Sequence, residues 1–422
     1  MRITSIQARQ ILDSRGNPTV ECSLALADGK SVLASVPSGA STGSHEAHEV
    51  RDGGSLYRGK GVLHAIKNIE EIIAPALVGK APDVVAADAT MLALDGTGNC
   101  DSLGANAMLA VSVAVLRAQA ATENLELFQF INQRWAFPAP RLPQCMFNLI
   151  NGGMHAQGSL AFQEFLIMPQ TGNFEEDLAL ADAVYYALKD LLEQKGRGSA
   201  VGDEGGFVPS FNPEDQAVAE RKALDLLRQA IQAVGKTEKI SIGIDAAATS
   251  FYQVDTGVYR LHGNNYKARD LIALYQDLVD DYALSWLEDP MAEDDWVGWQ
   301  RITALLGERV RLVGDDLFVT HLGRIKQGIL LGAANAVLIK PNQVGTVSQT
   351  IEAIKLCQAA GLVAIISHRS GETDDVFIAD LAVGSAVGLL KSGAPVRGER
   401  VGKYNRLLRI CDLLPVAARD LY

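Results

Sequence analysis

The feature that most constrains the fold is a series of eight short apolar segments between residues 144 and 391. In order they read QCMFNLIN, LAFQEFLIM, ISIGID, ALSWLED, VRLVGDD, NAVLIK, VAIISHR and VGLLK. Apolar runs of this length are typical of strands that are buried on both faces of a mostly parallel sheet. No helical stretch separates the first two runs, two helical stretches (about 175–196 and 213–234) precede the third, and later runs alternate strictly with helical patterns.

This order predicts an α/β fold, an irregular (β/α)8 TIM-like barrel of ββαα(βα)6 type. A different pattern precedes it. Residues 2–36 alternate apolar and polar side chains as strands do, with a hairpin-turn signal at Ala27-Asp28-Gly29-Lys30. Apolar residues recur at helical spacing in 62–77, and residues 104–122 indicate a mostly buried helix. We therefore expect a three-stranded meander with helices, which is a small α+β domain.

A domain boundary is indicated by three prolines, Pro138, Pro140 and Pro143, which interrupt the helical pattern. We expect residues 1–137 to form an N-terminal α+β capping domain. Residues 138–422 would form the C-terminal catalytic barrel.

Composition excludes several classes of protein. The net charge of −12 gives no attraction for nucleic acid or for an anionic membrane. The five cysteines are scattered without a CxxC pair, which favours a reducing cytosol over a disulfide framework or a zinc site. We find no signal peptide and no run of about 18 apolar residues, so we expect a cytoplasmic protein without a membrane span.

The ends of the apolar runs carry charge. Six consecutive runs end in Asp245, Glu288, Asp315, Lys340, the pair His368-Arg369, and Lys391. Two further acids, Glu164 and Glu204, lie in LAFQEF and GDEGG. Charges at a buried barrel mouth are costly unless they are paired or bind metal, and barrel active sites lie at the carboxyl ends of the strands. A single such residue is ordinarily a solvated or paired strand end, but six in succession predict an active site.

The residue types constrain the chemistry. Asp245, Glu288 and Asp315 offer hard oxygen ligands, which suit Mg²⁺ or Mn²⁺ rather than Zn²⁺. The cations Lys340, Arg369 and Lys391 face them across the barrel, and a lysine crowded by cations can be neutral enough to act as a base. A metal with such a lysine suits proton abstraction next to a carboxylate, because the metal stabilises the developing negative charge.

Two loops are weaker signals. Arg369-Ser370-Gly371 offers a guanidinium, a hydroxyl group and a flexible backbone, which suit a phosphate clamp. The glycine-containing segment Ser38–Gly43 could serve as a lid over the site, although an ordinary surface turn has the same composition.

Taken together, short motifs along the whole chain resemble the enolase family. They are ARQILDSRGNPTV at 8–20, VPSGASTG at 36–43, GKGV at 59–62, LGANA at 104–108, NGGMHA at 151–156, QEF at 163–165, GDEGGF at 202–207, LEDPMAEDDW at 287–296, GDDLFVT at 314–320, SHRSGETDD at 367–375, KSGAP at 391–395 and GKYNRLLRI at 402–410. A lysine base combined with Mg²⁺ is itself the known arrangement of that superfamily.

The resemblance implies two Mg²⁺ ions. Asp245, Glu288 and Asp315 would hold the first, and Ser41 in the lid would bind the second, which arrives with substrate. Lys340 would be the base at C2. The implied reaction is the reversible dehydration of 2-phosphoglycerate to phosphoenolpyruvate in glycolysis and gluconeogenesis.

The resemblance also implies which side chains handle the substrate, a small phosphorylated carboxylate. Glu204, with Glu164 beside it, would help the C3 hydroxyl group leave as water, and Lys391 would hold the substrate carboxylate. The implied catalytic set is Lys340, Glu204, Glu164, Lys391 and His368. The implied substrate-binding set is His155, Glu164, Lys391 and, for the phosphate, Arg369 and Ser370.

Some positions depart from the family pattern. Trp286 stands where a small residue is usual, and Thr249-Ser250 replaces a usual Ser-Glu pair. These departures leave open an enolase-like hydratase that acts on a related acid, such as a phosphonate analogue. A non-catalytic descendant is the other alternative, but the acid and lysine residues are all present. The resemblance further implies a homodimer or a larger homo-oligomer.

Overall fold

The computed structural model describes residues 1–39, 43–156, 158 and 160–415 of the chain. Ser41, the residue implied to bind the second Mg²⁺, lies outside these ranges. The N-terminal part opens with an antiparallel sheet in the order β1-β2-β3, formed by Ile3–Leu12, Pro18–Leu26 and Ser31–Ser35. Gly29, at φ +86°, turns the chain between β2 and β3, which confirms the predicted hairpin.

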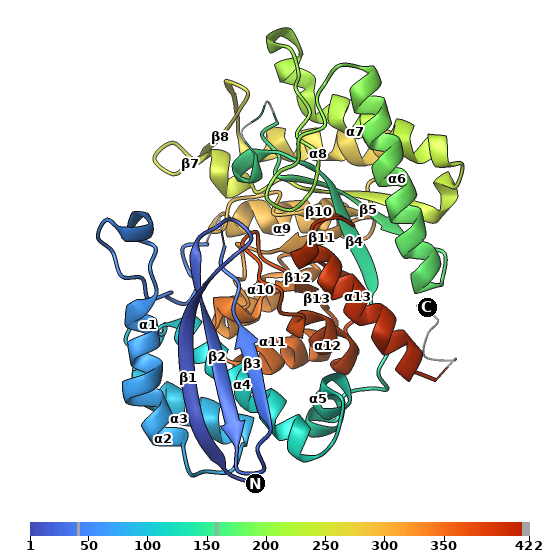
Figure 1. Cartoon of the computed structure of the whole chain (residues 1–422). Coiled ribbons are helices and arrows are strands. Elements are labelled where there is room, and N and C mark those ends of the chain that lie inside the picture. Colours follow the sequence, from blue (N-terminus) through green and yellow to red (C-terminus); the bar gives the residue numbers. More distant parts are fainter. Residues whose placement is uncertain (40–42, 157, 159, 416–422) are drawn as a thin grey trace.

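Helices pack on this sheet (Figure 1). They are α1 (Leu63–Asn68), η2 (Ile69–Ile73), α2 (Ala74–Leu77) and α4 (Ala105–Thr122). The N-terminal part also contains η1 (Leu56–Gly59), α3 (Val84–Asp95), which packs on α4, and α5 (Leu127–Trp135), which packs on α12 and α4. The helix expected over 62–77 is one run that includes a π turn at η2. Among the helices of the described ranges, α4 is the one that is long and apolar enough to cross a membrane, yet 78% of it is buried, as in the core helix of a folded domain.

Eight strands then close into a barrel, which confirms the predicted fold class. They are β4 (Gln144–Asn151), β5 (Glu164–Pro169), β6 (Ile240–Asp245), β10 (Trp286–Glu288), β11 (Arg311–Gly314), β12 (Ala336–Ile339), β13 (Val363–Ser367) and β14 (Leu389–Lys391). The strand β5 runs antiparallel to both β4 and β6, and all other neighbours are parallel. The two helices between β5 and β6 match the predicted ββαα start.

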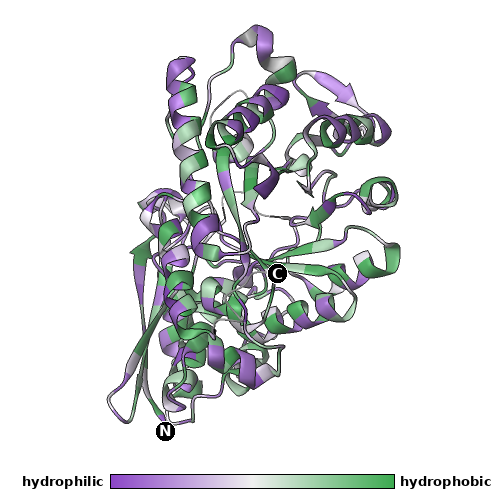
Figure 2. Cartoon of the chain, turned by 90° about the vertical axis from the view of Figure 1, so that its right-hand side faces the viewer, coloured by the Kyte–Doolittle hydropathy of each residue, from purple (hydrophilic) through white to green (hydrophobic). Residues whose placement is uncertain are grey.

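The helices that cover the barrel are α6 (Phe174–Gln194), α7 (Ala219–Val234), α8 (Ala268–Tyr282), α9 (Trp296–Leu306), α10 (Leu322–Leu331), α11 (Val347–Ala359), α12 (Phe377–Gly384) and α13 (Gly398–Leu413). Short helical turns lie in the connecting segments at η3 (Gly153–His155), η4 (Pro213–Val218), η5 (Thr237–Lys239), η6 (Ala248–Phe251) and η7 (Pro341–Gln343). Figure 2 shows mostly hydrophobic strands inside, with hydrophilic residues recurring along the outer helices.

The strict alternation expected after the third run is wrong at one place. A small antiparallel sheet, β7 (Tyr252–Gln253), β8 (Val258–Leu261) and β9 (Asn264–Tyr266), lies between β6 and α8. Its strands are too short for a periodic signal. Gly257 and Gly263, both at positive φ, mark the two turns and were the available sequence signal.

Inside the barrel, a separate apolar layer fills the space between the strands. Its buried members are Met146, Leu166, Trp286, Val313, Ala336, Leu338, Ile365 and Leu389. Side chains two residues apart on a strand point to the same face. The residues two positions further toward the catalytic end therefore also point into the barrel, directly above this layer.

Candidate active site

The strand register brings the predicted site residues together above the apolar layer. Lys340, Asp315 and Lys391 follow the layer residues Leu338, Val313 and Leu389 by two positions. Glu288 and Asp245 are register partners on β10 and β6. Lys391, Glu288 and Asp245 are at most 2% exposed, while the side chains of Lys340 and Asp315 retain 13% and 12% exposure.

The antiparallel strand β5 supplies Glu164 by a different route. The sequence predicted a strand over LAFQEFLIM, but β5 begins at Glu164, and the preceding residues form a loop. Because β5 runs in the opposite direction, its first residue lies at the barrel end where the other strands finish. Glu164 is therefore opposite Asp245 in the register and opposite Asn151 on β4.

Lys391 lies among three carboxylates. Its Nζ lies 2.8 Å from Glu164, 2.9 Å from each oxygen of Glu288 and 3.9 Å from Asp245. Burial opposes the charged form of Lys391, but these carboxylates outweigh it and hold the lysine pKa well above its usual value. Burial and the neighbouring carboxylates raise the pKa of Asp245 and that of Glu288, while Lys391 lowers both.

Lys340 lies one strand away and forms an ion pair with Asp315. Burial lowers the pKa of Lys340 and the attraction of Asp315 raises it, while the cations Arg369 and Lys391 lower it again; the net direction is upward. The neutral lysine expected from crowding by cations is thus opposed here by a carboxylate that sequence alone could not pair with it.

Two glutamates and two histidines form a second group. His155 Nδ1 lies 3.6 Å from Glu164 and 3.5 Å from Glu204, and His368 Nε2 lies 3.5 Å from Glu204. Asn148 donates a hydrogen bond of 2.9 Å to Glu204. Three side chains from different segments therefore surround the Glu204 carboxyl group.

The two glutamates have opposite acidities. Burial raises the pKa of Glu164 well above its usual value, and Glu204 adds to that rise. Burial also opposes the ionised form of Glu204, but His155, His368, Arg400 and Lys391 outweigh it and hold its pKa well below normal. A protonated carboxyl group beside an ionised one is the arrangement that general acid and base catalysis uses.

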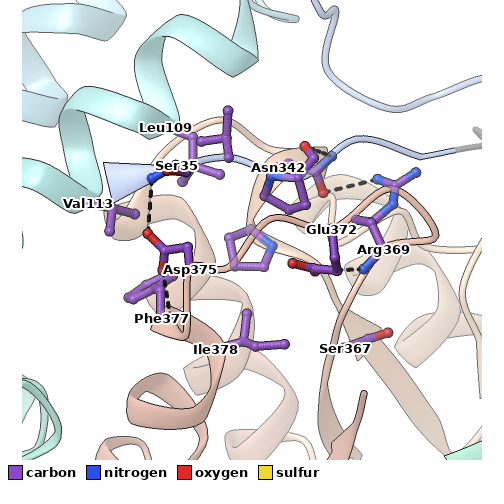
Figure 3. A pocket seen from close by; sticks show the side chains of 13 residues that line it. Ser35, Leu109, Val113, Asn342, Ser367, Arg369, Glu372, Asp375, Phe377 and Ile378 are labelled. Atoms are coloured by element: carbon purple, nitrogen blue, oxygen red, sulfur yellow. Dashed lines mark hydrogen bonds between the residues drawn. The ribbon is translucent and has the colours of Figure 1, made fainter. Parts of the chain in front are cut away.

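The expected phosphate clamp faces the N-terminal domain. The Arg369 guanidinium donates to Glu46 at 2.9 and 3.1 Å and to Asn342 at 3.0 Å. Its backbone N–H donates to Glu372 (Figure 3). Ser370 is 5% exposed in the same loop. The clamp residues are therefore held by partners from both domains.

The cavity drawn in Figure 3 is lined in part by Arg369 and lies between the two domains. Its apolar side chains include Leu109, Phe377 and Ile378. The polar side chain of Asp375 accepts a hydrogen bond from the Ser35 backbone at 2.9 Å. A second cavity is lined by most of the predicted site residues, namely His155, Glu164, Glu204, Asp245, Asp315, Lys340, His368, Arg369, Ser370 and Lys391.

Sequence reasoning missed Arg400. Its fully buried side chain donates to His368 Nδ1 at 2.5 Å, to the carbonyls of Arg369 and Ser370 at 2.5 and 2.6 Å, and to Asp203 at 3.2 Å. Because a guanidinium only donates, His368 Nδ1 must accept, and the neutral ring carries its proton on Nε2 toward Glu204. Arg400 lies on α13 and not at a strand end, so the strand pattern gave no signal for it.

The predicted metal ligands fit a hard cation by their chemistry. Asp245, Glu288 and Asp315 are buried and offer only oxygen donors, and burial of so much negative charge requires nearby cations. The tightest possible ligand groups among the described residues differ from this trio. They are His155 with Glu164 and Glu204, and Asp289 with Asp315 and Asp316. Lys391 and Lys340 lie between the predicted carboxylates instead.

Comparisons with known proteins agree over the whole chain. A family model described as "Enolase, C-terminal TIM barrel domain" matches residues 139–419, and one described as "Enolase, N-terminal domain" matches residues 3–131. A protein named "Enolase" from Corynebacterium kroppenstedtii is 47% identical to this chain over 421 residues. The alignment covers 99% of this chain and 96% of that protein.

Proposed function

This chain belongs to the enolase family and is a phosphopyruvate hydratase, and we propose that Lys340 and the Glu164–Glu204 pair carry out its chemistry. The reaction is the reversible removal of water from 2-phosphoglycerate to give phosphoenolpyruvate. The observation that supports these roles is that a lysine and two carboxyl groups of opposite acidity line one cavity at the barrel's carboxyl end.

Lys340 is the proposed base that removes the proton from C2. It must be neutral for this step, and Asp315 is the neighbour that keeps it charged. If Asp315 and Glu288, the two carboxylates that raise the pKa of Lys340, were ligands of Mg²⁺, their charge would be shared with the ion, and Arg369 and Lys391 would lower that pKa. Asp315 thus links metal binding to the basicity of Lys340.

Glu164 and Glu204 are the proposed pair that assists loss of the C3 hydroxyl group. The raised pKa of Glu164 keeps a proton available, and the lowered pKa of Glu204 keeps an ionised acceptor beside it. His155, which lies within 3.6 Å of both, orients them. A hydroxyl group leaves more easily as water when a positioned acid protonates it in the transition state.

The remaining roles concern binding. We propose that Lys391 binds the substrate carboxylate, that Arg369 and Ser370 bind the phosphate, and that His155 and His368 line the pocket. Because Glu46 already neutralises Arg369, the phosphate would compete with Glu46 for the guanidinium.

Mg²⁺ is the proposed cofactor, held by Asp245, Glu288 and Asp315, with a second ion held by Ser41. When bound, the ions supply positive charge next to the substrate carboxylate, where negative charge develops. We also propose a cytoplasmic location, a role in glycolysis, a homo-oligomeric state and a boundary between domains at residues 137 and 138.

The test is the rise in ultraviolet absorbance as the protein converts 2-phosphoglycerate, with Mg²⁺ and after chelation. Lys340→Ala should lose about 10²- to 10⁴-fold in turnover, the usual range for a general base. Lys326→Ala, which removes an exposed lysine from α10, is the matched control. Normal turnover by Lys340→Ala would overturn the assignment. Turnover of a phosphonate analogue in preference to 2-phosphoglycerate would overturn the substrate.

A further inference from the structure

Trp286 lies directly beneath a predicted metal ligand. It precedes Glu288 by two residues on β10, so both side chains point into the barrel. The indole is 1% exposed and belongs to the interior apolar layer. Its Nε1–H donates a hydrogen bond of 3.3 Å to Glu288 Oε2. A buried indole N–H requires an acceptor, and here the acceptor is a carboxylate of the active site.

A glycine on the neighbouring strand gives the large Trp286 side chain its space. Gly243 on β6 is the register partner of Trp286. A Cβ atom at Gly243 would lie 2.6 Å from Trp286 Cβ, which is too close for any side chain. Trp286 therefore occupies the interior volume that β6 leaves vacant.

Two donors fix the orientation of the Glu288 carboxylate. Lys391 Nζ donates to both oxygens at 2.9 Å, and Trp286 donates to Oε2 alone. Lys391 is the proposed binding group for the substrate carboxylate, so its contacts with Glu288 must be shared with substrate. The indole N–H lies below the carboxylate and has no competing acceptor among the hydrogen bonds of the described residues.

We propose that Trp286 is a positioning residue that orients Glu288 for the divalent cation. The inference rests on the proposed role of Glu288 as a Mg²⁺ ligand. Partners that hydrogen-bond a metal ligand from behind hold it in one orientation, and their loss commonly weakens metal binding 10- to 100-fold.

The experiment measures cation binding by the whole protein without substrate. Mn²⁺ serves as the paramagnetic probe, and electron paramagnetic resonance counts the free ion. Trp286→Phe keeps an aromatic ring in the interior layer but removes the N–H donor, and should bind Mn²⁺ about 10-fold more weakly than the natural protein. Trp299→Phe is the matched control, because Trp299 is equally buried and donates to the Ala292 carbonyl at 3.1 Å, away from Glu288.

The outcomes distinguish a failure of the proposed metal site from a failure of the proposed role of Trp286. If the natural protein does not bind Mn²⁺, the proposed metal site fails. If it binds and Trp286→Phe binds equally tightly, the positioning role of Trp286 is overturned. Weaker binding by both variants would indicate general loosening and would also overturn it.

A measurement on the natural protein covers the case in which Trp286→Phe does not fold. The chain has four tryptophans, so ¹⁵N-labelled indole gives four N–H resonances. The Trp286 signal can be assigned by elimination from single Phe variants of Trp135, Trp296 and Trp299. Addition of Mg²⁺ should shift the Trp286 signal most. An unchanged Trp286 signal in protein saturated with Mg²⁺ would contradict the proposal.

Discussion

At the scale of single residues, three of the charged site residues lie two positions beyond a residue of the interior apolar layer. Leu338, Val313 and Leu389 fill the barrel interior, and the residues two positions later are the charged Lys340, Asp315 and Lys391. The apolar layer excludes water from beneath the site. Electrostatic interactions in such surroundings are stronger than in water, which explains the opposite acidities of neighbouring carboxyl groups.

Arg400 allows a prediction at this scale. Arg400→Met would remove the guanidinium donor from the carbonyls of Arg369 and Ser370, although the Ser14 hydroxyl group would still donate to the Ser370 carbonyl at 3.4 Å. A buried polar group that loses its partner costs about 1–3 kcal/mol. We expect a loss of about 2–5 kcal/mol in unfolding free energy and a higher KM, because the proposed phosphate loop loses its support.

Urea denaturation and steady-state kinetics measure both effects. Arg400→Lys should recover part of the stability, since an ammonium group can still donate to one or two carbonyls. Equal stability and KM for Arg400→Met and the natural protein would show that the loop does not depend on Arg400.

At the scale of elements, one helix end joins the domains. Asp88 on α3 accepts hydrogen bonds from the backbone and hydroxyl group of Ser348, at 2.9 and 2.6 Å, in the first turn of α11. Burial raises the Asp88 pKa to about 6, with Asp83 adding to the rise, while Ser112 and Ser348 lower it. The helix end thus depends on a carboxyl group that titrates near neutrality.

The sign of the pH effect follows from this raised pKa. In the folded state Asp88 holds its proton to a higher pH than in the unfolded chain, so folding is disfavoured as pH rises from about 4 to about 6. Asp88→Asn keeps an acceptor for Ser348 and removes the titration. Relative to the natural protein, this variant should gain about 1 kcal/mol between about pH 5 and about pH 7.5.

Urea unfolding at the two pH values measures that gain. Asp182→Asn, on the exposed side of α6, controls for the loss of one negative charge. A stability difference between Asp88→Asn and the natural protein that does not change with pH would rule out the titration of Asp88.

At the scale of the whole molecule, the N-terminal domain and the barrel share ion pairs that are largely buried. Arg117 on α4 donates to both oxygens of Asp375, at 2.7 Å each, in the loop before α12. Burial opposes ionisation of Asp375, but Arg117 outweighs it and lowers the Asp375 pKa. Arg369 and Glu46 form a second pair across the same boundary. The domains therefore position the site jointly.

Removing one partner of the Arg117–Asp375 pair should destabilise the whole molecule. Arg117→Met leaves Asp375 without its cation. Because the Arg117 side chain keeps 19% exposure, we expect a loss near the lower end of the about 3–5 kcal/mol that breaking a fully buried pair costs. Arg309→Met removes a partner from the half-exposed pair with Asp280 and should cost less than about 1 kcal/mol. Denaturant unfolding followed by fluorescence compares them. Equal losses would contradict a special role for the domain boundary.

The sequence by itself determined the order of strands and helices and the charged strand ends. Both signals are local, because continuous apolar runs arise where a strand is buried on both faces, and charges stand where each run reaches the barrel mouth. Asp245, Glu288 and Lys340 were found in this way. The sheet β7–β9 was missed because its strands are shorter than any reliable period.

Only the tertiary structure decided which of these groups meet. Glu164 reaches the site because β5 is antiparallel, Arg400 reaches His368 from a helix near the carboxyl end, and Trp286 fits because Gly243 lies opposite. Lys340 pairs with Asp315 because their strands, β12 and β11, are parallel neighbours. These contacts join residues at least 25 positions apart in the sequence. Strand direction, register and side-chain volume fix them, and none of the three is a property of a single segment.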